Sequence, residues 1–164
     1  MGSHIQMSHP REMQPGTDFD HRHLLKALPF DSGLVCSNMG LKAGKRIGVK
    51  GEISAGAKSF VLNLGKDQAN IVLHFNARFD IHGDVRTIVC NSMDKGEWGA
   101  EQRESAFPFQ EGTKVEIFIT HDPSNLTITL PNNHQFKFPN RLGLQVIDFL
   151  NAEGDFIIKS IQLE

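Results

Sequence analysis

Polar side chains occupy every second position between His74 and Arg78. In an extended chain successive side chains point to opposite faces, so His74, Asn76 and Arg78 would project together and the residues between them would project the other way. An imidazole, an amide and a guanidinium donate and accept hydrogen bonds in different directions. Such a row suits a ligand that is covered in hydroxyl groups.

Two segments that follow in the sequence carry groups that suit the same ligand. Asn91 supplies another amide, Glu101 and Arg103 supply a carboxylate and a second guanidinium, and Trp98 supplies the one indole of the chain. An indole ring offers a flat apolar surface that a patch of C–H groups can contact. Together these residues predict a sugar-binding site.

Each of these residues also has a plainer explanation. A polar strand face near Glu101 and Arg103 is often only a solvated surface, with ion pairs that contribute up to ~1 kcal/mol each. His74 and His82 with Asp84 are alternative metal ligands, although a catalytic zinc site needs tighter convergence than this spacing indicates. The agreement of three segments favours the sugar site, and we expect no metal and no cofactor.

The length and charge of the chain exclude several other classes. Its 164 residues correspond to one domain with a substantial core. The 17 Lys and Arg residues nearly balance the 19 Asp and Glu residues, so no strong basic field favours nucleic acid or an anionic membrane. No apolar run approaches the roughly 18 to 20 residues that span a bilayer, and the N-terminus lacks the pattern of a secretory signal. We therefore expect a soluble protein made in the cytosol, without a nucleic-acid partner or membrane insertion.

The cysteines do not form a recognisable motif. Cys36 and Cys90 are too few and too far apart for a disulfide framework or a CxxC metal or redox site, so we expect free thiols. Cys90 adjoins Asn91 and would point to the opposite face of the strand, into the core. Cys36 is then the thiol expected to be more open to oxidation.

Residues 1–31 differ in composition from the rest of the chain and form an N-terminal leader. They mix prolines, histidines and scattered charges, and the first four residues resemble the remnant of an expression tag. Terminal segments of this kind are usually mobile, which is what we expect here. The alternative is that the apolar stretch at residues 24–28 packs on the domain or docks a partner.

Short strands are predicted throughout the remaining chain. Alternating, β-branched and aromatic runs predict strands at residues 47–53, 59–64, 71–75, 87–90, 115–119, 126–130, 135–138 and 156–163. Residues 145–150 fit either a strand or a single helical turn. Many short strands without a long amphipathic helix between them predict an all-β fold, an antiparallel sandwich or barrel.

The three polar segments also match a known family. From Leu34 to Glu164 the chain closely resembles the galectins, especially their single-domain prototype members. The galectin sugar site has the patterns H-x-N-x-R, V-x-N and W-G-x-E-x-R, and these positions are held here by His74, Asn76, Arg78, Val89, Asn91, Trp98, Glu101 and Arg103. One departure is Ala77, where the family usually has proline. Its side chain would face away from the sugar, so binding should survive with a slightly less rigid strand.

The resemblance implies a fold and a ligand. The fold would be an antiparallel two-sheet β-sandwich of the jelly-roll, concanavalin-A-like type, with the carbohydrate-recognition domain at residues 32–164. The ligands would be β-galactosides such as lactose and N-acetyllactosamine-type glycans, with Trp98 against the apolar face of galactose. Glu101 is expected between Arg78 and Arg103, holding both guanidinium groups. We expect His82 and Asp84 to contact a second sugar or to brace Arg103.

The resemblance also implies how the protein would act. It would be a lectin rather than an enzyme and would cross-link glycoproteins as a homodimer through its terminal segments, residues 34–36 and 157–161. It would be cytoplasmic and, after export without a signal peptide, extracellular. The leader precedes the first of these segments and could obstruct that dimer.

Two rival functions remain from the sequence. A glycoside hydrolase on a similar sandwich needs two carboxyl groups about 5 to 9.5 Å apart, one with a raised pKa, and the arginines near Glu101 disfavour that. A protein-interaction module with a vestigial sugar site is the other, and the complete motif argues against it.

Overall fold

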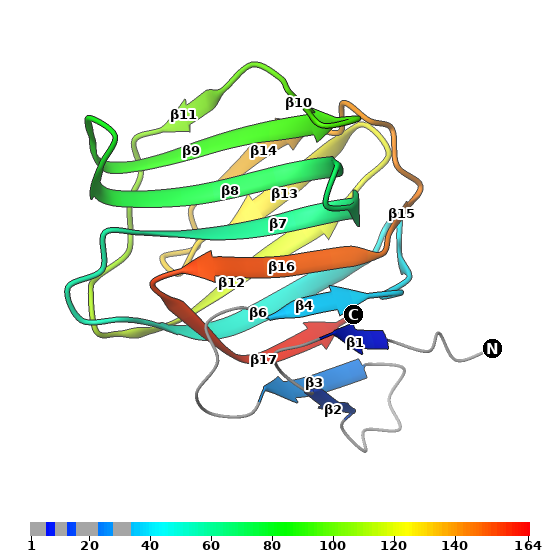
Figure 1. The fold of residues 1–164 in the computed structure, drawn as a ribbon, viewed down its shortest axis with the longest axis horizontal. Helices are drawn as coiled ribbons and strands as arrows, with labels where there is room; N and C mark the ends of the chain where they lie inside the picture. Colours follow the sequence, from blue (N-terminus) through cyan, green and yellow to red (C-terminus); the bar gives the residue numbers. More distant parts are fainter. Residues whose placement is uncertain (1–5, 9–12, 16–22, 28–33) are drawn as a thin grey trace.

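The protein is a sandwich of two antiparallel β-sheets (Figure 1). The computed structural model describes residues 6–8, 13–15, 23–27 and 34–164, with side chains from residue 34 onward. Among these residues there is no helix, and therefore none that could cross a membrane. The predicted all-β fold class is confirmed.

The sheet that faces the viewer in Figure 1 is called the front sheet, and the one behind it the back sheet. Within the described residues, the front sheet consists, in spatial order, of β1 (Gln6–Ser8), β4 (Val35–Ser37), β16 (Phe149–Gly154), β7 (Ser59–Asp67), β8 (Asn70–Ile81), β9 (Asp84–Asp94) and β10 (Glu97–Trp98), with β11 (Gln102–Glu104) also paired to β9. The back sheet consists of β14 (Gln135–Pro139), β13 (Asn125–Thr129), β12 (Lys114–His121), β6 (Arg46–Ile53), β17 (Phe156–Leu163), β3 (His23–Ala27) and β2 (Met13–Pro15). A small ribbon pairs β15 (Val146–Ile147) with β5 (Leu41–Lys42).

The core lies between the sheets and is rich in phenylalanine. Phe60 of β7 stacks on Phe156 of β17 with ring centroids 4.7 Å apart, and the edge of Phe109 meets Phe60 at 5.4 Å. All three rings are fully buried, and each contributes about 1.5–3 kcal/mol through removal of its apolar surface from water. Gly51 of β6 makes room for this cluster, because a Cβ there would lie 2.2 Å from the Phe156 ring.

The predicted strands are present, and several are longer than predicted. The strand predicted at residues 71–75 extends from Asn70 to Ile81, and the one predicted at residues 87–90 extends from Asp84 to Asp94. Both pair along most of their length, so cross-strand hydrogen bonds continue past the apolar runs that reveal them in the sequence. The ambiguous residues 145–150 belong to β15 and β16 rather than to a helical turn.

The described parts of the leader lie along the sheet edges. β1 pairs with β4 at the edge of the front sheet; in the back sheet β3 pairs with β17, and β2 pairs with β3 at the edge. Of the apolar stretch at residues 24–28, residues 24–26 pair with β17, and packing of its side chains on the domain stays a prediction. The remainder of the leader for which mobility is expected lies outside the described residues.

The cysteines are free and buried, which corrects one prediction. Cys90 faces the core as expected, and burial raises the pKa of its thiol. Cys36 was expected to be the more accessible thiol, but it is fully buried, and desolvation raises its pKa to about 12. The reason is that the alternation of β4 points the Cys36 side chain into the core, whereas Val35 and Ser37 on either side of it are only half-buried.

Candidate functional site

The outer face of the front sheet carries the polar row of β8. The alternation of β8 buries Phe75, Ala77 and Phe79 in the core, as predicted, and turns His74 and Arg78 to the outer face. A rigid central strand, paired on both sides by β7 and β9, therefore fixes the spacing of the polar groups.

A pocket of about 330 Å³, called the Trp98 pocket, opens on this face. It is lined by His74, Arg78, Val89, Asn91, Trp98, Gly99 and Glu101. The Trp98 side chain is 51% exposed, and its ring meets the edge of the His74 ring with centroids 4.7 Å apart. An apolar ring of this size exposed beside a polar pocket has the form of a binding surface rather than of a core residue.

A charged network continues from the pocket along the sheet. Asn76 is buried; its amide donates to the carbonyl of Phe60 at 3.0 Å, and its oxygen accepts from Arg78 Nε at 2.8 Å. Arg78 also donates to Asp84 at 2.6 Å, and Arg103 donates to the same carboxylate at 3.1 Å. These bonds hold two guanidinium groups in fixed directions.

This arrangement corrects the predicted position of Glu101. Glu101 pairs with Arg103 at 2.6 Å, but among the described ion pairs it is Asp84 that joins Arg78 to Arg103. The hydrogen bonds from Arg103 and Arg78 lower the pKa of Asp84. The expectation that Asp84 braces Arg103 agrees with these contacts. The sequence does not reveal which carboxylate binds both Arg78 and Arg103, because Asp84 and Glu101 are both near the arginines in sequence.

Asn91 and Arg141 hold the segment that carries Trp98. The Asn91 amide donates to the carbonyl of Gly99 at 3.0 Å. Arg141, which follows β14 and stacks on the Phe138 ring, donates to the carbonyl of Ala100 at 2.8 Å and to Ser92 Oγ at 3.1 Å. The position of the indole is thus set from β9 and from the turn after β14, which are distant in sequence, and no signal in the sequence predicts this role of Arg141.

A second pocket, of about 310 Å³, adjoins the first on the other side of His74 and Trp98. Its polar lining comes from Asn63, Gln68, Asn151 and Glu153 in addition to His74. Sequence reasoning missed these residues. By contrast, His82 lies in the turn between β8 and β9 and lines neither pocket.

His74 is neutral near neutral pH. Burial of its ring lowers the pKa, Glu153 and Glu101 oppose that effect, and Arg78 adds to it. A neutral imidazole has one nitrogen that donates and one that accepts. Within the part of the chain that the structure describes, no group of three or more metal-ligating side chains is found.

Comparison with known proteins decides the family. A sequence profile described as galactoside-binding lectin matches residues 33–163. Galectin-1 of Bos taurus is 61% identical over 132 residues, which are 80% of this chain and 98% of that protein. The chain belongs to the galactoside-binding lectin family. Another relative of this lectin, the beta-galactoside-binding lectin of Gallus gallus, is 58% identical over 132 residues, 80% of this chain and 97% of that protein.

Solved structures of galectins share the fold. A homodimeric agglutinin from chicken liver matches with a TM-score of 0.78 and 48% identity, covering 80% of this chain and 99% of that one. A toad ovary galectin in complex with thio-digalactose matches with a TM-score of 0.79 and 44% identity, covering 82% of this chain and all of that one, 100%. The galectin β-sandwich is therefore confirmed, and the family is one of carbohydrate-binding lectins rather than enzymes.

Proposed function

We propose that this lectin binds β-galactosides, such as lactose and N-acetyllactosamine-type glycans, through the Trp98 pocket. The supporting observation is the half-exposed indole of Trp98 in a pocket that polar and charged side chains also line, namely His74, Arg78, Asn91 and Glu101. The toad galectin complex with thio-digalactose supports the same ligand class. The residues proposed to bind carbohydrate are His74, Asn76, Arg78, His82, Asp84, Asn91, Trp98, Glu101 and Arg103.

The apolar side of galactose is proposed to lie on Trp98. The axial hydroxyl of galactose leaves the opposite face of its ring as a patch of C–H groups. An indole that lies flat against this patch removes both apolar surfaces from water. About half of the Trp98 surface is exposed and open to that contact, and among the described residues its one ring contact is with the edge of His74.

The polar side of galactose is proposed to face the β8 row. Arg78 and the second amide hydrogen of Asn76 donate, and the unprotonated nitrogen of His74 accepts. An epimer with an equatorial hydroxyl would leave these groups unpaired, at a cost of roughly 1–3 kcal/mol each. That cost would discriminate galactose from glucose. His82 is proposed to contribute only toward a second sugar, since it lies outside both pockets.

The carboxylates of the site suit binding rather than hydrolysis. A glycosidase needs an acid whose pKa is raised. Here Asp84 accepts from two arginines, which lower its pKa, and Glu101 pairs with Arg103 at 2.6 Å. Held in this way, both groups act as hydrogen-bond acceptors that orient guanidinium donors.

A single shallow site of this kind is expected to bind weakly. Dissociation constants of roughly micromolar to millimolar correspond to about −8 to −4 kcal/mol. We propose that a homodimer with two sites gains about 10²-fold or more in avidity and bridges glycoproteins. The chicken agglutinin, described as homodimeric, supports this assembly.

We also propose that the protein is cytoplasmic and becomes extracellular by export without a signal peptide. The two free thiols are compatible with synthesis in the reducing cytosol. Fractionation of producing cells and their medium, with a cytosolic enzyme as a marker for lysis, tests this proposal. Appearance in the medium only together with the marker would contradict it.

Replacement of the indole tests the sugar site directly. Trp98→Ala is expected to lower the affinity for lactose about tenfold or more, because the stacking surface is lost, while the fold survives because the side chain is half exposed. Calorimetry and retention on immobilised lactose measure the effect. Val85→Ala, at another exposed apolar residue, is the matched control and should bind as the unaltered chain does. Undiminished retention of folded Trp98→Ala would refute the proposal.

A further inference from the structure

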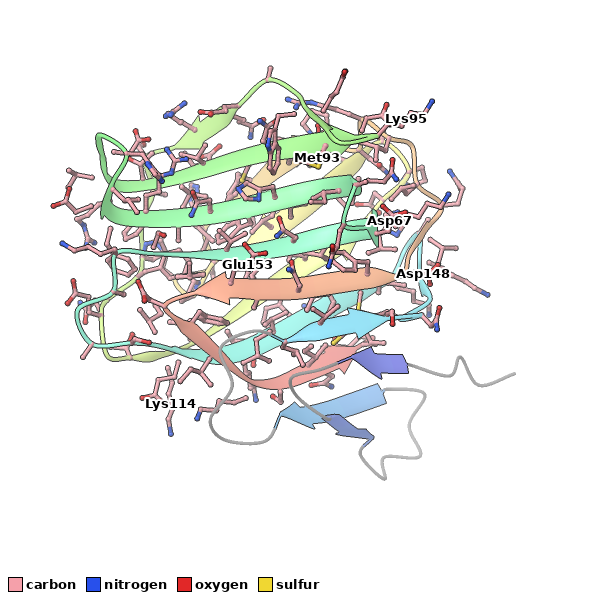
Figure 2. All side chains as sticks on the ribbon, viewed as in Figure 1. Asp67, Met93, Lys95, Lys114, Asp148 and Glu153 are labelled. Carbon is pink, nitrogen blue, oxygen red and sulfur yellow. The ribbon has the colours of Figure 1, made fainter. Side chains whose placement is uncertain are left out.

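A polar row crosses four strands of the front sheet. The register aligns Asn91 of β9 with His74 of β8, His74 with Asn63 of β7, and Asn63 with Asn151 of β16. Glu153 lies two residues beyond Asn151 on the same strand, and both line the second pocket. Figure 2 shows Glu153 over the front sheet, near β7 and β16.

The side chains of this row form a continuous chain of hydrogen bonds. Asn151 Nδ2 donates to Glu153 Oε1 at 3.0 Å. Asn63 Nδ2 donates to Asn151 Oδ1 at 2.8 Å. Asn63 Oδ1 lies 2.7 Å from Nδ1 of His74. The two asparagines are buried, and so is the bond between them, while the bonds to His74 and Glu153 at either end are partly buried.

The carboxylate fixes the direction of every bond in this chain. An ionised carboxylate only accepts, so Asn151 must turn its NH₂ group to Glu153 and its oxygen to Asn63. Asn63 must then turn its own NH₂ group to Asn151 and its oxygen to His74. Because Nδ1 of His74 then faces an amide oxygen, which only accepts, Nδ1 carries the proton. A neutral ring protonated at Nδ1 has its lone pair at Nε2.

Nε2 is the ring nitrogen left for a ligand. Among the described residues, no hydrogen bond involves Nε2 of His74, whereas the oxygen of Asn76 is already engaged by Arg78. A sugar hydroxyl that accepts from Arg78 still needs an acceptor for its own proton. Nε2 of His74 is such an acceptor on the β8 row.

We propose that Glu153 is a positioning residue that, through Asn151 and Asn63, keeps the His74 ring protonated at Nδ1 so that Nε2 accepts from a ligand hydroxyl. The role of Glu153 in ligand binding rests on the proposed sugar site, whereas its effect on the His74 tautomer does not. Glu153 lines the second pocket and not the Trp98 pocket, so it acts on the ligand through its partners.

The hydrogen-bonded chain from Glu153 through Asn151 and Asn63 to His74 is called the relay. Reversing the direction of its hydrogen bonds provides the test. In Glu153→Lys the ammonium only donates, so Asn151 and Asn63 should both turn over and present an NH₂ group to His74. Nitrogen NMR of the full chain, labelled with ¹⁵N and without sugar, should report protonation at Nδ1 in the unaltered protein and at Nε2 in Glu153→Lys. The affinity for lactose should fall roughly tenfold, because a donor replaces the acceptor.

Two further variants separate the relay from charge alone. Asp80→Lys makes the same change of charge at an exposed position of β8 and should leave both the tautomer and the affinity unchanged. Adding Asn151→Asp to Glu153→Lys restores an acceptor beside Asn63, so protonation at Nδ1 and most of the affinity should return. The amide NMR spectrum of each variant verifies its fold.

The outcomes distinguish this proposal from the proposed function. Retention of the Nδ1 proton in a folded Glu153→Lys variant would overturn the relay, even if the unaltered chain binds lactose. An altered tautomer with unchanged lactose affinity would overturn the role of the relay in binding. Failure of the unaltered chain to bind lactose would instead refute the sugar site, while the tautomer measurement would still decide the relay.

Discussion

His74 is the residue of the Trp98 pocket whose protonation state is expected to affect sugar binding. Its pKa lies below the ordinary histidine value of 6.5 because burial penalises the charged ring, while Glu153 and Glu101 favour the charge and Arg78 opposes it. A protonated ring would present a donor at Nε2 where the sugar needs an acceptor.

Lactose affinity is therefore expected to be constant near neutral pH and to fall on acidification. The fall should begin only below the ordinary range of histidine titration, because the neutral form is retained to lower pH in the folded protein. Calorimetry from about pH 8 to about pH 5 measures this profile.

Glu153→Gln provides the control for this profile. Its amide oxygen can still accept from Asn151, but the nearby negative charge that favours protonation of His74 is removed, so the loss of affinity should move to still lower pH. Asp84 is not expected to contribute in this range, because its own pKa is lowered from 3.8. An affinity that increases as the pH falls would contradict the assignment of the neutral ring as the binding form.

Single residues show what the sequence could predict and what it could not. His74 and Arg78 were predicted together because the alternation of one strand is a local property. The partner of Arg78 was not predicted correctly, because Asp84 and Glu101 are both near it in sequence and only the turn geometry selects between them. Asn63 and Asn151 are 88 residues apart, and strand register, which is set by the whole sheet, brings them together.

At the scale of elements, the segment that carries Trp98 depends on anchors rather than on its own strand. β10 is only two residues long and pairs with the end of β9. The amide of Asn91 and the guanidinium of Arg141 bind the backbone beyond it. The sequence predicted the position of Trp98 by its motif, and the support from Arg141 arises from the packing of β14 behind the front sheet (Figure 1).

Arg141→Lys tests this support while it keeps the charge. Lysine lacks the planar guanidinium that stacks on Phe138 and so holds Nη1 between Ala100 and Ser92, and the indole should lose its fixed position. The affinity for lactose is expected to fall about threefold to tenfold, with little change in melting temperature, because these bonds lie at the surface. Calorimetry and thermal unfolding measure the two quantities.

Gly99→Ala approaches the same anchors from the other side. A Cβ at this position would lie 3.0 Å from Arg141 Nη1 and 3.1 Å from Ser92 Oγ, so the added methyl group should displace them. It is expected to reproduce the loss of affinity seen in Arg141→Lys. Unchanged binding in both variants would show that the indole is positioned without these contacts.

At the scale of the whole molecule, described strands of the leader occupy the places where the dimer is predicted to form. Exposed edge strands pair readily with other chains. In this structure β1 pairs with β4 and β3 pairs with β17. The terminal segments predicted to form the dimer, residues 34–36 and 157–161, lie largely in β4 and β17. A dimer that joins sheets edge to edge there would require the leader strands to leave.

Removal of the leader is therefore expected to strengthen the dimer. A chain that begins at Ser32 should show a dimer dissociation constant roughly tenfold or more below that of the full chain, which corresponds to about 1.4 kcal/mol of competing strand pairing. Sedimentation equilibrium of both chains measures the difference. Leu25→Pro in the full chain is the matched control, because proline removes a backbone donor from β3, which pairs with β17 at Ile161. Leu25→Pro should shift the dimer dissociation constant of the full chain toward that of the truncated chain. If the unaltered full chain dimerises as tightly as the truncated chain, the leader does not compete for these edges.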